Sequence, residues 1–197
     1  MAPLPAIRSR KLRAARHDAS HDLGVARQVN LRLRPLRLDD EAEFLAAHDE
    51  MESEDFVFGL GYERGMPWRT YVDRMAAWPH GVDLPPGFVP TTFLVADVDD
   101  QIVGRSSIRH ELNEFLAHEG GHIGYCVLAE HRRRGYATEI LRQSLEIVRS
   151  VGVERVLVTC DDDNVGSATI IERSGGVFDS LAESRDDGKP VRRYWID

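Results

Sequence analysis

The order of elements between residues 121 and 160 constrains the fold of this chain more than any other feature. GHIGYCVL at 121–128 has the composition of a strand, and RVLVTC at 155–160 is short and continuously apolar, as expected for a parallel strand buried on both faces. Between them, the run 138–152 repeats apolar residues at helical spacing and reaches Gly152, a natural helix terminator. This order predicts an α/β fold.

The loop between the first strand and the helix reads HRRRGYAT (131–138). A loop that enters a helix presents unpaired backbone N–H groups, and the helix dipole adds partial positive charge. Gly135 lets the backbone approach a ligand closely, and Ala137 leaves no bulk in the way. We therefore interpret the loop as a pyrophosphate cradle, with a solvated basic turn as the alternative. Neither GxxxxGK[ST] nor GxGxxG is present here.

The remaining elements are predicted from periodicity and from Pro and Gly positions. A helix should begin at a capping box formed by Asp40 and Glu43, and Pro35 should keep the preceding strand at a sheet edge. The residues between 110 and 120 read as a polar connection. The expected strands are 31–36, 91–98, 101–109, 177–184 and 191–197, and the other expected helices are 67–78 and 165–174.

The formal net charge of the 197 residues is -8, but it is unevenly distributed. Residues 1–28 carry six Lys or Arg against two Asp, about +4, so residues 29–197 are near -12. That body should repel nucleic acid and attract cationic substrates. We expect one domain over 29–197 and interpret 1–28 as a disordered basic tail, a transit-peptide-like leader or an upstream start-codon artefact. A nucleic-acid-binding arm would lack aromatic residues for stacking.

Only two cysteines occur, Cys126 and Cys160, both within apolar runs. This usage favours a reducing, cytoplasmic location and two buried thiols, and it gives no reason to expect a metal site. No apolar run approaches the roughly 20 residues that a membrane-spanning helix needs, so no membrane partner is expected.

Arg132-x-x-Gly135-x-Ala137 resembles the [QR]-x-x-G-x-[GA] signature of the GCN5-related N-acetyltransferases (GNAT). Asn164-x-x-Ser167, followed by the segment 172–176 (ERSGG), is similar to a second segment of that family, and the resemblance covers roughly 29–197. It implies a mixed, mostly antiparallel twisted sheet of six to seven strands with about four helices. It also implies acetyl-CoA as the acyl donor and coenzyme A as the product.

The same resemblance assigns roles to residues. Backbone groups of Cys126, Val127 and Leu128 would pair with the pantetheine arm. Asn164 and Ser167 would contact the pantetheine or the adenine side. The pyrophosphate would lie against the amides of the loop, with the Thr138 hydroxyl as a further donor; the cofactor-binding loop residues are Arg132, Arg133, Arg134, Gly135, Tyr136, Ala137 and Thr138.

Acetyl transfer needs a base that deprotonates the ammonium, and His122 is the first choice because an unperturbed His titrates near neutrality. Glu111 and His110 are its rivals. The leaving thiolate can take a proton from an acid, for which the family often uses a tyrosine seven residues after the Asn. That position is Ile171 here, so either the thiolate leaves unassisted or Tyr125 substitutes.

These considerations predict an N-acetyltransferase that acts on a primary amine by direct attack in a ternary complex. The acceptor would be a small cationic amine or a peptide or protein amine, attracted by the acidic body, and the protein would be a monomer or homodimer. The alternative is a non-catalytic acyl-CoA-binding or sensor protein of the same fold. A third hypothesis makes residues 1–28 an RNA or ribosome contact. A covalent Cys126 nucleophile is not expected, because apolar surroundings raise a thiol's pKa.

Overall fold

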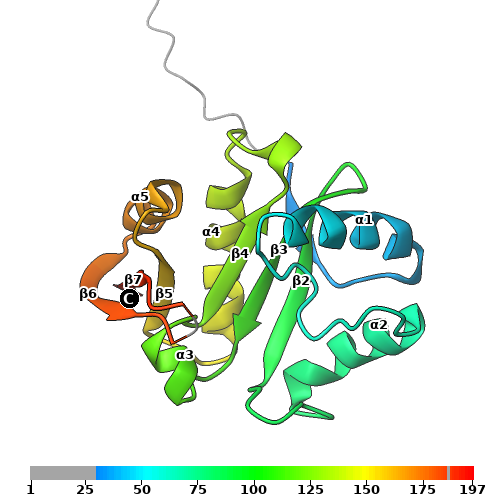
Figure 1. Cartoon of the computed structure of the whole chain (residues 1–197), viewed down its shortest axis with the longest axis horizontal. Helices are drawn as coiled ribbons and strands as arrows, with labels where there is room; N and C mark the ends of the chain where they lie inside the picture. Colours follow the sequence, from blue (N-terminus) through cyan, green and yellow to red (C-terminus); the bar gives the residue numbers. More distant parts are fainter. Residues whose placement is uncertain (1–29, 186) are drawn as a thin grey trace, which may run out of the picture.

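The computed structural model describes residues 30–185 and 187–197 (Figure 1). The basic segment 1–28 and every prediction made for it lie outside these residues. The described chain forms one seven-stranded sheet in the order β1-β2-β3-β4-β5-β7-β6, with five α-helices. Every neighbouring pair of strands is antiparallel except β4 and β5. The mixed, mostly antiparallel sheet is as predicted, with one more helix than expected.

The elements follow the predicted order along the chain. The strands are β1 (Arg32–Arg34), β2 (Thr91–Val98), β3 (Gln101–Arg109), β4 (Ile123–Val127), β5 (Val156–Asp161), β6 (Val177–Glu183) and β7 (Pro190–Ile196), and the α-helices are α1 (Glu41–Glu52), α2 (Trp68–Ala77), α3 (Glu114–His118), α4 (Tyr136–Ser150) and α5 (Val165–Arg173). The prediction missed α3, which lies in the polar connection. Its N-cap is Asn113, whose Oδ1 accepts from the N–H of Leu116 at 2.9 Å.

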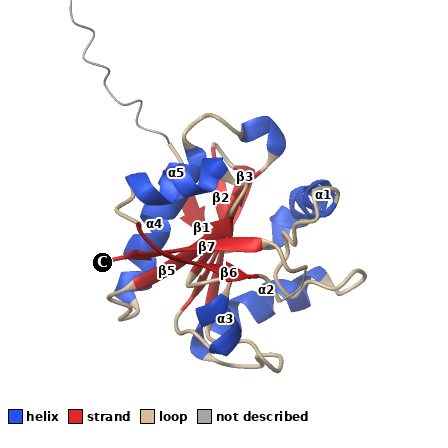
Figure 2. Cartoon of the chain, turned by 60° about the vertical axis from the view of Figure 1, so that its left-hand side comes forward, coloured by secondary structure: helices blue, strands red, loops and turns tan. Residues whose placement is uncertain are grey.

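Helices cover both faces of the sheet (Figure 2). On one face, α1 and α2 pack an aromatic-rich core against β2 and β3, with Phe44 and Tyr71 fully buried at its centre. On the other face, α4 and α5 pack against the central strands through Leu141, Leu145 and Ile171. The sheet therefore has an α1–α2 face and an α4–α5 face.

The hairpin of β2 and β3 contains an irregularity that affects the site. Its turn residues Asp99 and Asp100 both have positive φ, as in a two-residue type I′ turn. Further along, Ala96 pairs with Gly104 whereas Asp97 pairs with Ile102, so β3 has one extra residue in between. Such a bulge reverses which face the following side chains take. As a result Arg105, like its partner Val95, lies on the α1–α2 face.

The predicted capping box at Asp40 is wrong. Asp40 makes no side-chain cap to α1; its carboxylate instead accepts hydrogen bonds from the Arg34 guanidinium at 2.6 and 2.8 Å. Glu43 accepts from the N–H of Ile102 at 2.8 Å. Asp40 also accepts from the N–H of Arg37 at 2.7 Å, so it caps the turn before α1 and pairs with Arg34 instead of capping α1 itself. A buried guanidinium needs such anionic neighbours.

The parallel contact between β4 and β5 is short. Ile123 and Val158 are the only residues registered across it, and β5 pairs along its whole length with β7 instead. The apolar run of β5 is buried as predicted, with Val156, Leu157 and Val158 fully enclosed. Beyond Ile123 the two parallel strands separate, which opens the sheet at its centre.

Candidate active site

The loop from β4 to α4 exposes a row of backbone donors. Arg133 has a φ of 64° and Gly135 one of 85°, so the chain takes two left-handed turns just before α4 begins. No side chain caps the helix, and the amides of residues 133–138 donate to no acceptor among the described residues. Successive free amides at a helix N-terminus bind anions. The geometry thus agrees with the predicted cradle.

The three arginine side chains of the loop have different surroundings. The Nη2 of Arg132 donates to Glu54, just after the end of α1, and its Nε donates to the carbonyl of Val127 at 3.0 Å. Arg134 donates to the carbonyl of Glu130, whereas Arg133 has no polar partner among the described residues and is exposed. Arg132 therefore anchors the loop, and Arg133 and Arg134 are the arginines at its rim.

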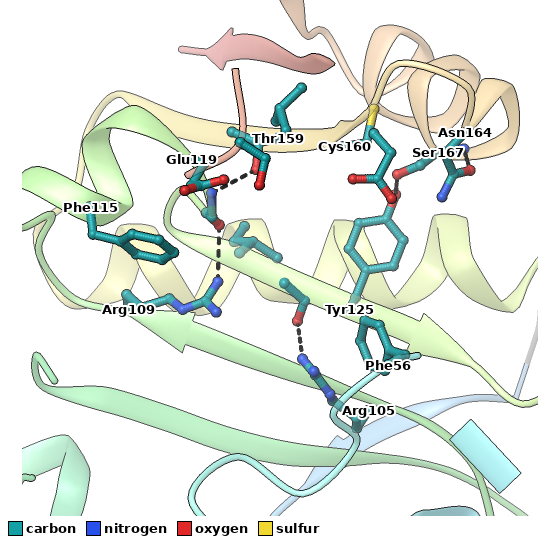
Figure 3. A pocket seen from close by; sticks show the side chains of 16 residues that line it. Phe56, Arg105, Arg109, Phe115, Glu119, Tyr125, Thr159, Cys160, Asn164 and Ser167 are labelled. Carbon is teal, nitrogen blue, oxygen red and sulfur yellow. Dashed lines mark hydrogen bonds between the residues drawn. The ribbon is translucent and has the colours of Figure 1, made fainter. Parts of the chain in front are cut away.

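A cavity of about 360 Å³ occupies the gap where β4 and β5 separate (Figure 3). Gly124 and Tyr125 of β4 form one wall, and Thr159 and Cys160 of β5 form the other. The cavity extends to both faces of the sheet. Asn164 and Ser167 line it from the start of α5, and Phe56 and Phe115 line it with apolar surface.

Two arginines of β3 also line this cavity, the buried Arg105 and the partly buried Arg109. Arg105 donates to the carbonyls of Gly124 (2.9 Å) and Val57 (2.8 Å), and Arg109 donates to the carbonyl of Gly120 (3.1 Å). Burial lowers the pKa of Arg109 to about 10, and the nearby charge of Arg105 adds to this effect. Sequence reasoning missed both residues, although a charged residue inside the apolar run QIVGRSSIR was a signal.

Tyr125 points from β4 toward α5 (Figure 3), where its hydroxyl lies 3.0 Å from the Oγ of Ser167. Burial raises the pKa of Tyr125 to about 12, so the phenol stays protonated at neutral pH and can donate a proton. Ile171 is fully buried in the core and offers no polar group. Tyr125 is thus the tyrosine that lines the described cavity.

Asn164 and Ser167 are brought together at the start of α5. The Oδ1 of Asn164 accepts from the N–H of Ser167 at 3.0 Å and caps the helix. That bond leaves the amide nitrogen of Asn164 without a partner among the described residues, at the cavity wall. The pair is well placed to meet a ligand that runs along β4.

His122 lies outside the cavity lining. Its ring is buried, and its Nδ1 accepts from the N–H of Leu157 at 2.9 Å, which links the start of β4 to β5. Burial lowers the pKa of His122 to about 4, with a smaller effect from the charge of Arg109. A nitrogen already occupied by a backbone bond is poorly placed to take a proton from an acceptor, so the geometry favours a structural histidine.

The two rivals of His122 also lie away from the cavity lining. Glu111 is exposed, and the Nε2 of His110 lies 2.8 Å from the hydroxyl of Thr92. The carboxylates that line the cavity are instead Glu119, which is buried, and Asp161 at the end of β5. Glu119 follows α3, the helix that sequence reasoning missed, so its position could not be inferred from the pattern.

The backbone groups predicted to hold the pantetheine arm are of two kinds, those that bond within the sheet and those that point away from it. The N–H of Leu128 donates to Val103 at 3.0 Å and belongs to the sheet, whereas the carbonyl of Val127 points away from β3 toward Arg132. Cys126 is buried, and burial raises the pKa of its thiol to about 11. A thiol with that pKa is a poor nucleophile at neutral pH.

Within the part of the chain that the structure describes, no helix is long and apolar enough to cross a membrane. Likewise, residues 30–185 and 187–197 contain no cluster of three or more His, Cys, Asp or Glu that could hold a metal ion.

A row of free amides beside a sheet opened at its centre is an arrangement that suits an anionic, extended ligand. The family follows from the sequence: residues 30–177 match the acetyltransferase (GNAT) domain, so the chain belongs to the GNAT acetyltransferases. It is an acyltransferase that depends on acetyl-CoA. No curated protein matches the sequence significantly.

Solved structures with this fold share little sequence with the chain. RimJ of Mycobacterium smegmatis, in complex with CoA-disulfide, is 19% identical with a TM-score of 0.60, over 84% of this chain and 81% of that one. RimL, a ribosomal L7/L12 alpha-N-protein acetyltransferase, is 14% identical (TM-score 0.60; 84% and 89%). The microcin C7 self-immunity acetyltransferase MccE, in complex with acetyl-CoA and AMP, is 13% identical (TM-score 0.60; 84% and 91%). Identities this low support the fold only.

Proposed function

We propose that this protein is an N-acetyltransferase that transfers the acetyl group of acetyl-CoA to a primary amine by direct attack in a ternary complex. The observation that carries the proposal is the run of free amides at 133–138 at one end of β4, next to a cavity that crosses the sheet. Solved relatives with acetyl-CoA or CoA-disulfide, and one that acetylates a ribosomal protein's α-amine, are consistent with it.

The residues present fit the acyl donor. The amides of 133–138 and the side chains of Arg133, Arg134 and Thr138 would hold the pyrophosphate, and Val127, Asn164 and Ser167 would meet the pantetheine arm. The thioester supplies an activated acetyl carbon. The acceptor nitrogen forms a C–N bond to that carbon while the C–S bond breaks, so one proton must leave the amine and the thiolate can accept one.

Two cavity residues suit these proton transfers. Tyr125 is a protonated phenol at the wall of the cavity and would protonate the thiolate, in place of the tyrosine that Ile171 replaces. Glu119 is a buried carboxylate of the same cavity and would take the amine proton, directly or through a water molecule. We prefer it to His122 and Glu111 because neither of those lines the cavity.

The cofactor site can be tested by calorimetric titration of acetyl-CoA, with Gly135→Val as the damaged site. Gly152→Val is the matched control, because Gly152 also has a left-handed φ, 94°, lies at the opposite end of α4 and has open space around it. We expect micromolar binding in the wild type and in Gly152→Val, and none in Gly135→Val. Equal loss in both variants would trace the effect to helix strain and contradict the cradle.

Turnover tests the chemistry. In Tyr125→Phe we expect kcat to fall by roughly 100-fold, the usual contribution of a general acid, with the Kd for acetyl-CoA unchanged. An unchanged kcat would mean that the thiolate leaves unassisted.

A second candidate function is a non-catalytic acyl-CoA-binding or sensor protein. The buried Ile171, at the position where the family often has its acid, is the observation that favours it. Both functions require acetyl-CoA binding, so only turnover with an amine separates them. Binding without turnover against a broad amine panel would support the sensor.

A further inference from the structure

Arg105 is a buried cation and Arg109 a partly buried one, and neither has an anionic partner among the described residues. Neither forms an ion pair with a carboxylate of the described chain, and their hydrogen bonds go to uncharged oxygens. A buried charge is costly unless it is paired. The cavity is therefore lined by two arginines that form no ion pair with any carboxylate of the described residues, on a protein whose overall charge is negative.

Both guanidinium groups keep free donors. A guanidinium has five N–H groups, and Arg109 uses one of them, toward Gly120. The Nε of Arg105 is buried without a partner. The carbonyls that accept from these arginines hold them in fixed orientations, so the Nη donors that remain free are preorganised for an acceptor in the cavity, whereas the Nε of Arg105 is enclosed by protein.

Gly124 of β4 makes room for this arrangement. A Cβ at that position would lie 3.0 Å from Nη1 and 3.4 Å from Nη2 of Arg109, so the guanidinium lies directly over the glycine. Any larger residue would push Arg109 away from the strand. The Phe56 ring lies 4.6 Å from the Arg105 guanidinium and also lines the cavity, giving it an apolar wall.

These arginines are separate from the pyrophosphate cradle. Arg109 lies beside Gly120 and Gly124, near the N-terminal end of β4, whereas the free amides of 133–138 follow its C-terminal end. Acetyl-CoA bound along β4 with its pyrophosphate at the cradle leaves Arg109 on the acceptor side. Tyr125 points toward α5, while Arg105 and Arg109 lie on the other side of β4 (Figure 3).

We propose that the acceptor carries a carboxylate close to its amine and that Arg105 and Arg109 bind this carboxylate inside the cavity. The inference rests on the proposed function and narrows it to amines with an anionic neighbour. Glu119 and Asp161 line the same cavity and provide negative charge for the ammonium end. A free amino acid and a peptide with an acidic residue beside its N-terminus share this chemistry.

The test compares acids with their amides. Each of the twenty amino acids is compared with its own carboxamide. Dipeptide amides whose second residue is Asp or Glu are compared with dipeptide amides whose second residue is Asn or Gln. Initial rates of coenzyme A release give kcat/KM for each. The best acid should exceed its amide roughly 30-fold or more, as expected for a buried charge pair. Discrimination within the amino-acid pairs would indicate a small acceptor, and discrimination within the dipeptide pairs a peptide.

The variant Arg109→Met should abolish the discrimination, and Arg109→Lys should retain part of it. Arg142→Met is the matched control, because Arg142 is an exposed arginine on α4 that pairs with Glu139 and Glu146. Arg142→Met should discriminate like the wild type. Equal rates for acids and amides in the wild type, with normal turnover, would overturn the inference and leave the acetyltransferase standing.

A binding readout separates the two proposals if no acceptor turns over. The melting temperature is measured with each acid and each amide at 10 mM, in the presence of coenzyme A. Stabilisation by acids alone, lost in Arg109→Met, would support the carboxylate site even in a protein without turnover. No acid-specific stabilisation and no acid-specific turnover would refute it.

Discussion

Arginines lie in the interior of this protein in two regions, which differ in whether carboxylates pair with them. Arg34 of β1 donates to Asp40 and Asp97, with distances of 2.6 to 2.8 Å, and all three side chains are nearly inaccessible. On β3, Arg105 is similarly enclosed and Arg109 is partly buried, and neither has a carboxylate partner in the described chain. Burying an arginine costs stability unless an anion compensates its charge. Asp40 and Asp97 compensate Arg34, whereas the carboxylate of the proposed acceptor would compensate Arg105 and Arg109.

The largest expected effect comes from breaking the ion pairs of Arg34. Arg34→Met leaves the buried carboxylate of Asp40 without an ion pair and leaves Asp97 with Arg32 alone, and it should cost about 3–5 kcal/mol of unfolding free energy. Urea denaturation measures this loss. Arg142→Met, at the exposed ion pairs of α4, should cost less than about 1 kcal/mol. A similar loss of unfolding free energy in both variants would mean that the buried ion pairs of Arg34 stabilise the fold no more than the exposed ion pairs of Arg142.

His122 is another buried basic residue, and its ring stays neutral in the folded protein at neutral pH. Its pKa in the folded protein, about 4, lies below the unfolded value near 6.5. Between these values the unfolded chain binds a proton that the folded protein does not, so stability should fall as pH drops from about 6.5 to about 4, by up to about 3 kcal/mol.

The variant His122→Asn tests this directly, because its amide oxygen can still accept from the N–H of Leu157. Its stability should change less over that pH range than that of the wild type, as followed by urea denaturation at several pH values. If the variant instead kept the pH dependence of stability but lost turnover, His122 would be the base that the sequence suggested.

A smaller effect is expected from Gly124→Ala. The added Cβ would lie 3.0 Å from Nη1 of Arg109, and the end of this side chain can shift at modest cost. We expect about 1 kcal/mol of lost carboxylate binding, seen as a roughly fivefold higher KM for the carboxylate acceptor. An equal rise in KM for the matching amide would place the effect elsewhere in the cavity.

The smallest effect on stability is predicted for Arg109→Met. Removing an unpaired, partly buried charge relieves its desolvation, which offsets the lost hydrogen bond to Gly120. The unfolding free energy should therefore change by less than about 1 kcal/mol, even though acceptor discrimination disappears. A loss as large as that of Arg34→Met would show that Arg109 stabilises the fold, and the comparison between the two regions would fail.

The net charge of the protein differs from the charge that its cavity presents to a ligand. The net charge of -8 suggested a cationic acceptor attracted by an acidic body. Locally, the cavity presents two arginines as well as Glu119 and Asp161, which suits a molecule that carries both charges. Net charge describes the long-range field, whereas recognition depends on the few groups that face the ligand.

Local sequence patterns determined the parts of this protein that depend on neighbouring residues alone. Helical spacing predicted α4, continuous apolarity predicted the buried β5, and the Gly135 motif predicted the loop with free amides. Each is a short-range consequence of backbone preferences and side-chain periodicity. The family resemblance carried by the same motif is confirmed by the match over residues 30–177.

Only the tertiary structure decided which polar side chains reach the cavity. The extra residue of β3 between Ile102 and Gly104 sets the face on which Arg105 lies. The packing of β4 beside β5 places the ring of His122 where it accepts a hydrogen bond from the N–H of Leu157. The sequence contained these residues but not their directions. A side chain in a strand changes face with a shift of one residue, and that shift depends on pairing with a distant strand.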